Sequence, residues 1–186
     1  MASKKEVLIV LADGFEEVEA ITPIDVLRRG GVNVVISGLN GQMVTSSRKI
    51  TIKADIAFND YNGDPDVLIL PGGMPGTENL AKSVKLKDMI KKMNSKKKII
   101  AAICAAPAII LAPLGILDNK RATCYPGMEE NFSSLVKFGE EKVVRDGNII
   151  TSRGPATASN FALLILEQLA GKEVASVIAQ GMLFAE

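Results

Sequence analysis

Short hydrophobic runs alternate along this chain with longer segments of mixed hydrophobic and polar residues. Short, mostly aliphatic runs occur at residues 7–11, 32–37, 67–70 and 99–103. Runs of this length with few interleaved polar residues are typical of strands that are buried on both faces. Each run therefore predicts a strand of a parallel sheet.

Longer segments between these runs have the composition of helices. Residues 16–29 begin with glutamates and end with two arginines, which is the arrangement that the helix macrodipole favours. Further helices are predicted over residues 78–94, near 107–111 and over about 158–169, and Gly171 provides a stop signal after the last of them.

Two segments depart from this alternation. Residues 42–58 form short alternating stretches, which indicate an antiparallel excursion. Residues 143–150 resemble a β-hairpin with Asp146-Gly147 as its turn. The remaining strands and helices predict a single doubly wound α/β domain over residues 1–186, with a mostly parallel sheet and helices on both faces.

Composition narrows the class of protein. The chain has 22 basic and 21 acidic side chains and a net charge of +1, so nothing favours binding to nucleic acid. No apolar stretch approaches the roughly 20 residues of a transmembrane helix. The run at 7–11 is too short for a signal peptide, and acidic residues follow it at once. We therefore expect a cytoplasmic protein that does not associate with membranes, with Cys104 and Cys124 as free thiols.

The segments that could form a functional site lie where predicted strands end. Ligands of doubly wound sheets bind outside the carboxyl ends of the strands. The acidic segment 13–19, the glycine-rich loop 71–76 and Cys104 each follow a predicted strand directly. We expect these three segments to lie together.

Cys104 stands at a predicted strand-to-helix turn among small residues. A nucleophile at such a turn needs small neighbours, and alanines surround it. A helix N-terminus would lower the pKa of its thiol. The alternative is a small core residue, because free cysteines are often buried. Gly72-Gly73 could aim backbone amides at an oxyanion, or form a plain tight turn.

Four segments together resemble the DJ-one/PfpI superfamily, and within it the DJ-one (ThiJ-like) branch. They are Asp13-Gly14-Phe15-Glu16-Glu17-Val18-Glu19, Leu70-Pro71-Gly72-Gly73, Ala101-Ala102-Ile103-Cys104-Ala105-Ala106-Pro107 and Thr151-Ser152-Arg153-Gly154-Pro155. The resemblance implies a flavodoxin-like fold, a homodimer and a reactive cysteine.

The resemblance also implies roles for individual residues. Cys104 matches the family's nucleophilic, oxidation-sensitive cysteine, and Glu19 matches a glutamate whose protonated carboxyl hydrogen-bonds the sulfur. Gly73 and Ala105, with Gly72 beside them, match positions whose amides line an oxyanion site. A carboxyl group beside a thiolate does not easily ionise as well, so the pair should titrate as a unit.

The chain departs from the family at one position. Many relatives carry a histidine where this chain has Tyr125, and the protease-like branch carries one at the position of Ala105; this chain contains no histidine. A Cys–His protease, a glutamine amidotransferase triad and a histidine-based metal site are therefore disfavoured, and no cofactor or metal is expected.

Four further residues are candidates for a substrate pocket. Tyr125 could orient a substrate or serve in packing, and Arg48 could attract an anionic group or lie at a dimer interface. Arg153 and Pro155 are expected to shape the pocket wall. Cys124 is either a second redox-active thiol or a core residue.

The resulting hypothesis is a cofactor-free glyoxalase or deglycase. Cys104 would attack a small 2-oxoaldehyde such as methylglyoxal, or its glycation adducts, and Glu19 would relay a proton to form a hydroxy acid. The alternative is a redox-sensing, chaperone-like stress protein that acts through oxidation of Cys104. A third possibility is a cysteine hydrolase or intracellular protease.

Overall fold

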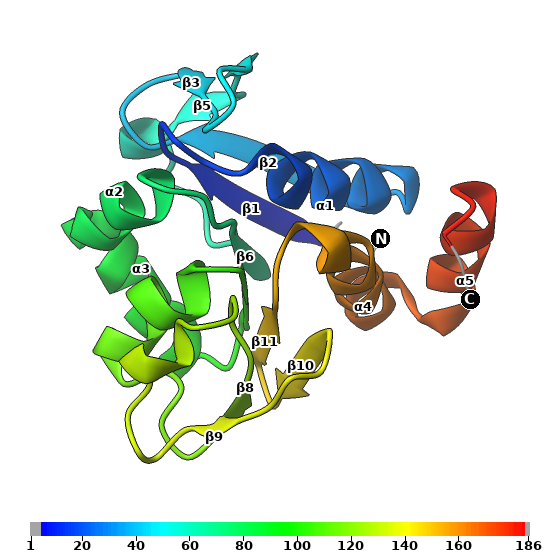
Figure 1. Ribbon diagram of the computed structural model, residues 1–186. Helices are drawn as coiled ribbons and strands as arrows, with labels where there is room; N and C mark the ends of the chain where they lie inside the picture. Colours follow the sequence, from blue (N-terminus) through cyan, green and yellow to red (C-terminus); the bar gives the residue numbers. More distant parts are fainter. Residues whose placement is uncertain (1–4, 185–186) are drawn as a thin grey trace.

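A seven-stranded sheet forms the centre of the computed structural model, which describes residues 5–184 (Figure 1). Its order is β10-β11-β7-β6-β1-β2-β5, and all neighbours are parallel except β10 and β11. The strands are β1 (Glu6–Leu11), β2 (Asn33–Gly38), β5 (Ile56–Ala57), β6 (Val67–Leu70), β7 (Ile99–Ile103), β10 (Val143–Asp146) and β11 (Ile149–Ser152). This sheet confirms the predicted α/β fold class.

Helices cover both faces of the sheet because the central strands alternate their side chains between two cores. Val7, Ile9 and Leu11 of β1 pack with α1 (Glu17–Arg29) and α4 (Ala158–Ala170). Leu8 and Val10 face α2 (Gly76–Lys82) and α3 (Val84–Ser95) on the other side (Figure 1).

Several local features differ from the predicted elements. The helix predicted over 78–94 is two helices, because Ser83 ends α2 and its side chain accepts a hydrogen bond from Leu86 N (3.2 Å) to cap α3. The hairpin turn is Gly147-Asn148, since Asp146 still pairs with Ile149. Gly147 has a φ of +60°, a conformation that glycine adopts without cost. The segment after Cys104 is a π-helical turn, η2 (Pro107–Leu111), followed by a 3₁₀ turn, η3 (Ala112–Leu114).

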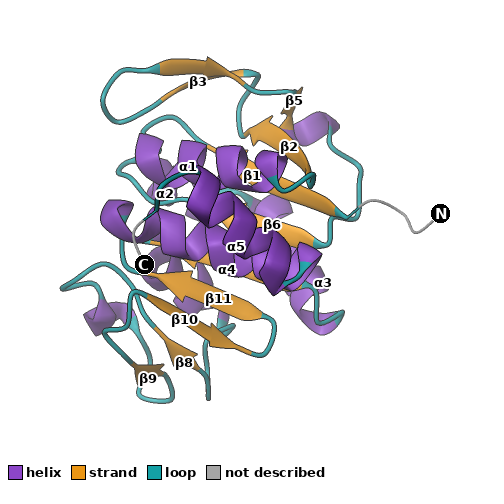
Figure 2. Cartoon of the chain, turned by 90° about the vertical axis from the view of Figure 1, so that its right-hand side faces the viewer, coloured by secondary structure: helices purple, strands orange, loops and turns teal. Residues whose placement is uncertain are grey.

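Some elements had no counterpart in the predicted pattern. A further helix, α5 (Lys172–Gly181), follows Gly171 and packs on α4 (Figure 2). Two short strands, β8 (Arg121–Ala122) and β9 (Lys137–Phe138), pair outside the main sheet. The antiparallel excursion is confirmed as β3 (Met43–Thr45) and β4 (Thr51–Lys53), whereas β5 joins the main sheet in parallel. The remaining 3₁₀ turns are η1 (Phe58–Asp60), η4 (Glu129–Asn131) and η5 (Pro155–Thr157).

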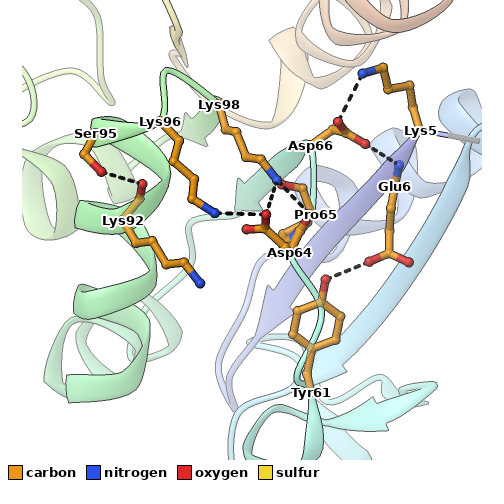
Figure 3. A network of polar contacts seen from close by, with 10 residues as sticks. All are labelled: Lys5, Glu6, Tyr61, Asp64, Pro65, Asp66, Lys92, Ser95, Lys96 and Lys98. Atoms are coloured by element: carbon orange, nitrogen blue, oxygen red, sulfur yellow. Dashed lines mark hydrogen bonds and ion pairs between the residues drawn. The ribbon is translucent and has the colours of Figure 1, made fainter. Parts of the chain in front are cut away.

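A polar network fastens the amino ends of the central strands (Figure 3). The hydroxyl of Tyr61 donates to Glu6 Oε1 (2.7 Å), and Glu6 N donates to Asp66 Oδ2 (3.0 Å). Lys96 and Lys98 both pair with Asp64, at 3.0 and 2.9 Å. Lys96 and Lys98 precede β7, so these ion pairs lie at the amino ends of the strands, whereas Cys104 follows the carboxyl end of β7.

No helix within residues 5–184 combines the length and the hydrophobicity that are needed to cross a membrane.

Candidate functional site

The carboxyl ends of three neighbouring strands bring Cys104, Glu19 and Gly72 together. Cys104 follows β7, Gly72 follows β6, and Glu19 lies in the first turn of the helix that follows β1. A Cβ atom added to Gly72 would lie 2.7 Å from both Cys104 Cβ and Glu19 Oε2. Only a glycine therefore permits this close approach of the three segments.

Cys104 occupies a sharp turn in the backbone. Its φ is +64°, in the left-handed region that residues other than glycine rarely adopt. Hydrogen bonds hold the turn on both sides: Cys104 N donates to Ser152 O (2.9 Å), and Tyr125 N donates to Cys104 O (2.9 Å). Such strain persists only where the surroundings impose it, and it is characteristic of functional sites. The turn leaves Cys104 partly exposed, whereas Ala105 and Ala106 are buried.

Glu19 is a carboxyl group without solvent exposure. Its Oε2 accepts a hydrogen bond from Gly72 N (2.8 Å), while Oε1 is buried without a hydrogen-bond partner among the described residues. Burial raises the pKa of Glu19 to about 7, and the Glu16 charge acts in the same direction. Interactions with the Cys104 thiol and with Gly72 N–H partly oppose this increase.

Glu16 completes a closed ring of hydrogen bonds around this carboxyl group. Its Oε2 accepts from Glu19 N (2.8 Å) as the N-cap of α1, and its own N–H donates to Gly72 O (3.0 Å). Gly72 N in turn donates to Glu19 Oε2. The ring ties the start of α1 to the loop after β6, and it fixes the position of the Glu19 carboxyl. Of the four acidic residues in the predicted segment 13–19, Glu19 is the one whose carboxyl lies beside Cys104.

The thiol of Cys104 has a raised pKa, not the lowered one predicted from a helix N-terminus. Burial is the largest cause, and the Glu19 carboxylate adds to it, while the amides of Ala105 and Gly73 act in the opposite direction. Since a carboxylate and a thiolate in contact repel each other, Glu19 and Cys104 together hold one proton above about pH 7.

A pocket of about 370 Å³ opens beside Cys104. The described residues that line it are Gly73, Met74, Cys104, Ala105, Tyr125, Pro126, Gly127 and Met128. Four candidates from the sequence are among them: Cys104, Gly73, Ala105 and Tyr125. Met74 could have been inferred from its place after Gly73, but no sequence signal marked Met128.

The other pocket candidates lie outside this lining. Arg48 is in the turn between β3 and β4, where its backbone N–H donates to Glu17 Oε1 (2.9 Å). The Arg153 guanidinium donates to the carbonyl of Glu140 (3.1 Å). Pro155 begins the 3₁₀ turn η5.

Cys124 differs from Cys104 in its environment, although both are free thiols. Cys124 has no solvent exposure. Burial and the nearby Glu129 raise the pKa of its thiol to about 12, and Arg153 opposes them. Its surroundings are those of a core residue.

Residues 5–184 contain no group of three or more Cys, Asp and Glu side chains placed to hold a metal ion.

Comparisons with known proteins show the family and the fold. The model of the DJ-1/PfpI family matches residues 5–168. Protein dj-1beta of Drosophila melanogaster is 44% identical over 97% of this chain and 98% of its own length. Its crystal structure superposes with a TM-score of 0.91, at 42% identity, and covers 98% of this chain and 100% of that one.

Two further proteins resemble this chain over nearly its whole length. A Caenorhabditis elegans protein described as glutathione-independent glyoxalase DJR-1.2 is 35% identical over the full length of both chains. A structure described as Toxoplasma gondii DJ-1, oxidized, has a TM-score of 0.91 and 38% identity, and covers 98% of this chain and 100% of its own.

Proposed function

This chain belongs to the DJ-1/PfpI family, and from that premise and the site geometry we propose that it is a cysteine-dependent, cofactor-free glyoxalase. Its substrates would be small 2-oxoaldehydes such as methylglyoxal. The observation that carries the proposal is the Glu19–Cys104 pair, which shares one proton beside an open pocket. The C. elegans relative described as a glyoxalase supports the same activity.

Addition of the thiolate to the aldehyde carbon is the first step. The Glu19 carboxylate takes the shared proton from the Cys104 thiol, the sulfur attacks C1 of the 2-oxoaldehyde, and the carbonyl electrons move to the oxygen. The amides of Gly73 and Ala105, which lie within reach of the sulfur, stabilise the oxyanion. Glu19 then donates its proton, which produces a hemithioacetal and leaves Glu19 as a carboxylate.

Proton transfer from C1 to C2 completes the internal oxidation and reduction. The Glu19 carboxylate removes the C1 proton to form an enediolate and returns it to C2, while the proton of the C1 hydroxyl passes to the C2 oxygen; the product is a thioester with a hydroxyl group on C2. Water hydrolyses the thioester, releases the 2-hydroxy acid and regenerates the Cys104 thiol beside the Glu19 carboxylate. C1 is oxidised and C2 is reduced, so the reaction consumes only water. A pKa of about 7 suits Glu19 for both donating and accepting a proton near neutral pH.

Lactate formation from methylglyoxal tests this proposal. We expect turnover by the wild type, none above background for Cys104→Ala, and a loss of roughly a hundredfold or more for Glu19→Gln. Cys124→Ser is the matched control and should retain activity, because Cys124 is buried outside the pocket. Wild-type turnover no better than that of Cys104→Ala would refute the proposal. The same variants, assayed on early glycation adducts, test deglycase activity.

Redox sensing through Cys104 is the second candidate function. The difference in exposure favours it, because Cys104 is partly exposed and Cys124 is fully buried. One peroxide would convert the thiolate to a sulfenate with release of water, and a second would give the sulfinate. Mass spectrometry after mild peroxide treatment should find two added oxygen atoms on Cys104 before any on Cys124. Equal oxidation of both would contradict this role.

The expected homodimer and cytoplasmic location also stand as proposals. Sedimentation equilibrium of the purified chain should report twice the monomer mass. Fractionation of the source cells should find the protein in the cytosol.

A further inference from the structure

We infer that the pocket beside Cys104 selects 2-oxoaldehydes with an apolar substituent on the keto carbon, such as an aryl group, over those with hydroxylated or charged substituents. The inference rests on the proposed function and adds the class of substrate.

The chemistry of the lining is the first observation. Met74, Tyr125, Pro126 and Met128 contribute the larger side chains, and all four are uncharged. The Cys104 thiol and the Tyr125 hydroxyl are the polar side-chain groups among the described lining residues. A substituent rich in hydroxyl groups would lose water here and regain few hydrogen bonds, which costs binding free energy.

Positively charged side chains are also absent from the lining residues that the structure describes. The described lining contains no Lys or Arg, and Arg48 and Arg153 lie outside it. A carboxylate on the substrate would therefore enter beside the Glu19–Cys104 pair, which itself bears one negative charge above about pH 7. Repulsion at short range disfavours anionic substrates such as glyoxylate.

The size and adaptability of the pocket also favour a large apolar substituent. A volume of about 370 Å³ is in the range of small-molecule sites, and the few heavy atoms of methylglyoxal would fill only a small part of it. Methionines adjust to irregular apolar groups, and Met74 and Met128 line the pocket from two different loops, which follow β6 and β8.

Tyr125 supplies an aromatic face beside the nucleophile. Its N–H donates to Cys104 O, and its ring lies beside Gly154, where an added Cβ would be 3.4 Å from Cδ2 of the ring. Tyr125 is 47% exposed and lines the pocket, so its side chain is accessible to a ligand. An aryl substituent can pack against such a ring.

A series of substrates with the same reacting atoms tests the inference. The kcat/KM values of phenylglyoxal, methylglyoxal and hydroxypyruvaldehyde are measured from the 2-hydroxy acid formed, with Cys104→Ala as the blank. We expect phenylglyoxal to exceed hydroxypyruvaldehyde by about tenfold or more, the ratio that burial of one aromatic group produces.

The three aldehydes also differ in their intrinsic reactivity toward a thiol. A measurement of binding by unreactive analogues does not depend on this difference. 2-Hydroxyacetophenone and dihydroxyacetone share a hydroxyketone and differ only in a phenyl or hydroxymethyl group. We expect 2-hydroxyacetophenone to protect Cys104 from iodoacetamide at an about tenfold lower concentration. Met128→Gln should reduce this ratio, whereas Met43→Gln, at an exposed residue of β3, should leave it unchanged.

The two arms separate failure of the inference from failure of the proposed function. Cys104-dependent turnover that favours hydroxypyruvaldehyde would overturn the inference and leave the glyoxalase proposal intact. Absence of turnover for every 2-oxoaldehyde would refute the glyoxalase proposal, and the protection ratio would still decide the selectivity of the pocket. Equal protection by the two ketones would overturn the inference in either case.

Discussion

At the level of single residues, Glu16 affects the candidate site in two ways: it caps α1, and it places a negative charge near Glu19. Glu16 is an unusual N-cap, since serine, threonine and aspartate are the common choices. Its carboxylate accepts from Glu19 N and also adds a negative charge close to the Glu19 carboxyl. A serine would provide the hydrogen bond without the charge. The charge is thus the feature that distinguishes Glu16 from a serine or threonine cap.

Replacement of Glu16 with Gln should separate these two effects. The amide oxygen still accepts from Glu19 N, but the charge that raises the pKa of Glu19 is lost. We expect the pH midpoint of Cys104 alkylation by iodoacetamide to move to lower pH by roughly half a unit. Glu17→Gln is the matched control, because Glu17 accepts instead from Ser46 and Arg48. A lowered unfolding temperature with an unchanged midpoint would show that Glu16 is only a cap.

At the level of elements, the hydrophobic pattern predicted the central strands well and the helix ends less well. Residues 67–70 and 99–103 are strands with the predicted bounds, because unbroken aliphatic runs suit a sheet covered on both faces. The break at Ser83 was missed, since the flanking residues 78–82 and 84–94 each keep a helical composition. A serine becomes a cap only when the chain changes direction there, which depends on packing against the sheet.

The Ser83 cap provides a prediction at this level. Ser83→Ala removes the side-chain acceptor for Leu86 N, so the free energy of unfolding should fall by about 1 kcal/mol. Ser95→Ala, at the exposed end of the same helix, should change it by less than about 0.5 kcal/mol. Chemical denaturation measures both. Equal effects of the two substitutions would mean that the cap contributes nothing specific.

At the level of the whole molecule, burial of Glu19 links the site to the stability of the fold. Folding raises the pKa of Glu19 from 4.5 to about 7, so the folded state binds a proton that the unfolded state has released. The stabilising effect of that proton is present below pH 4.5 and is lost as the pH rises through about 7. Glu17 and Asp66 have lowered pKa values and act in the opposite direction at acidic pH.

Comparison with Glu19→Gln isolates this contribution. Between about pH 4.5 and pH 8, the free energy of unfolding of the wild type should fall relative to that of Glu19→Gln by on the order of 3 kcal/mol. Denaturant titrations of both proteins across this range measure the difference. Parallel stability curves for the two proteins would mean that Glu19 has an ordinary pKa in the folded state. Cys104→Ala in the same series reports how far the thiol contributes.

The amino-acid sequence by itself determined the alternation of the central strands with helices, the parallel sheet and the family, because these depend on local patterns and on motifs within short segments. It also singled out Cys104, Glu19 and the two glycines. Only the tertiary structure decided which pocket residues surround Cys104, that Arg48, Arg153 and Pro155 lie outside that lining, and that the thiol pKa is raised. Burial and charge act through space between β1, β6 and β7, and residues distant along the chain become neighbours only when the sheet has formed.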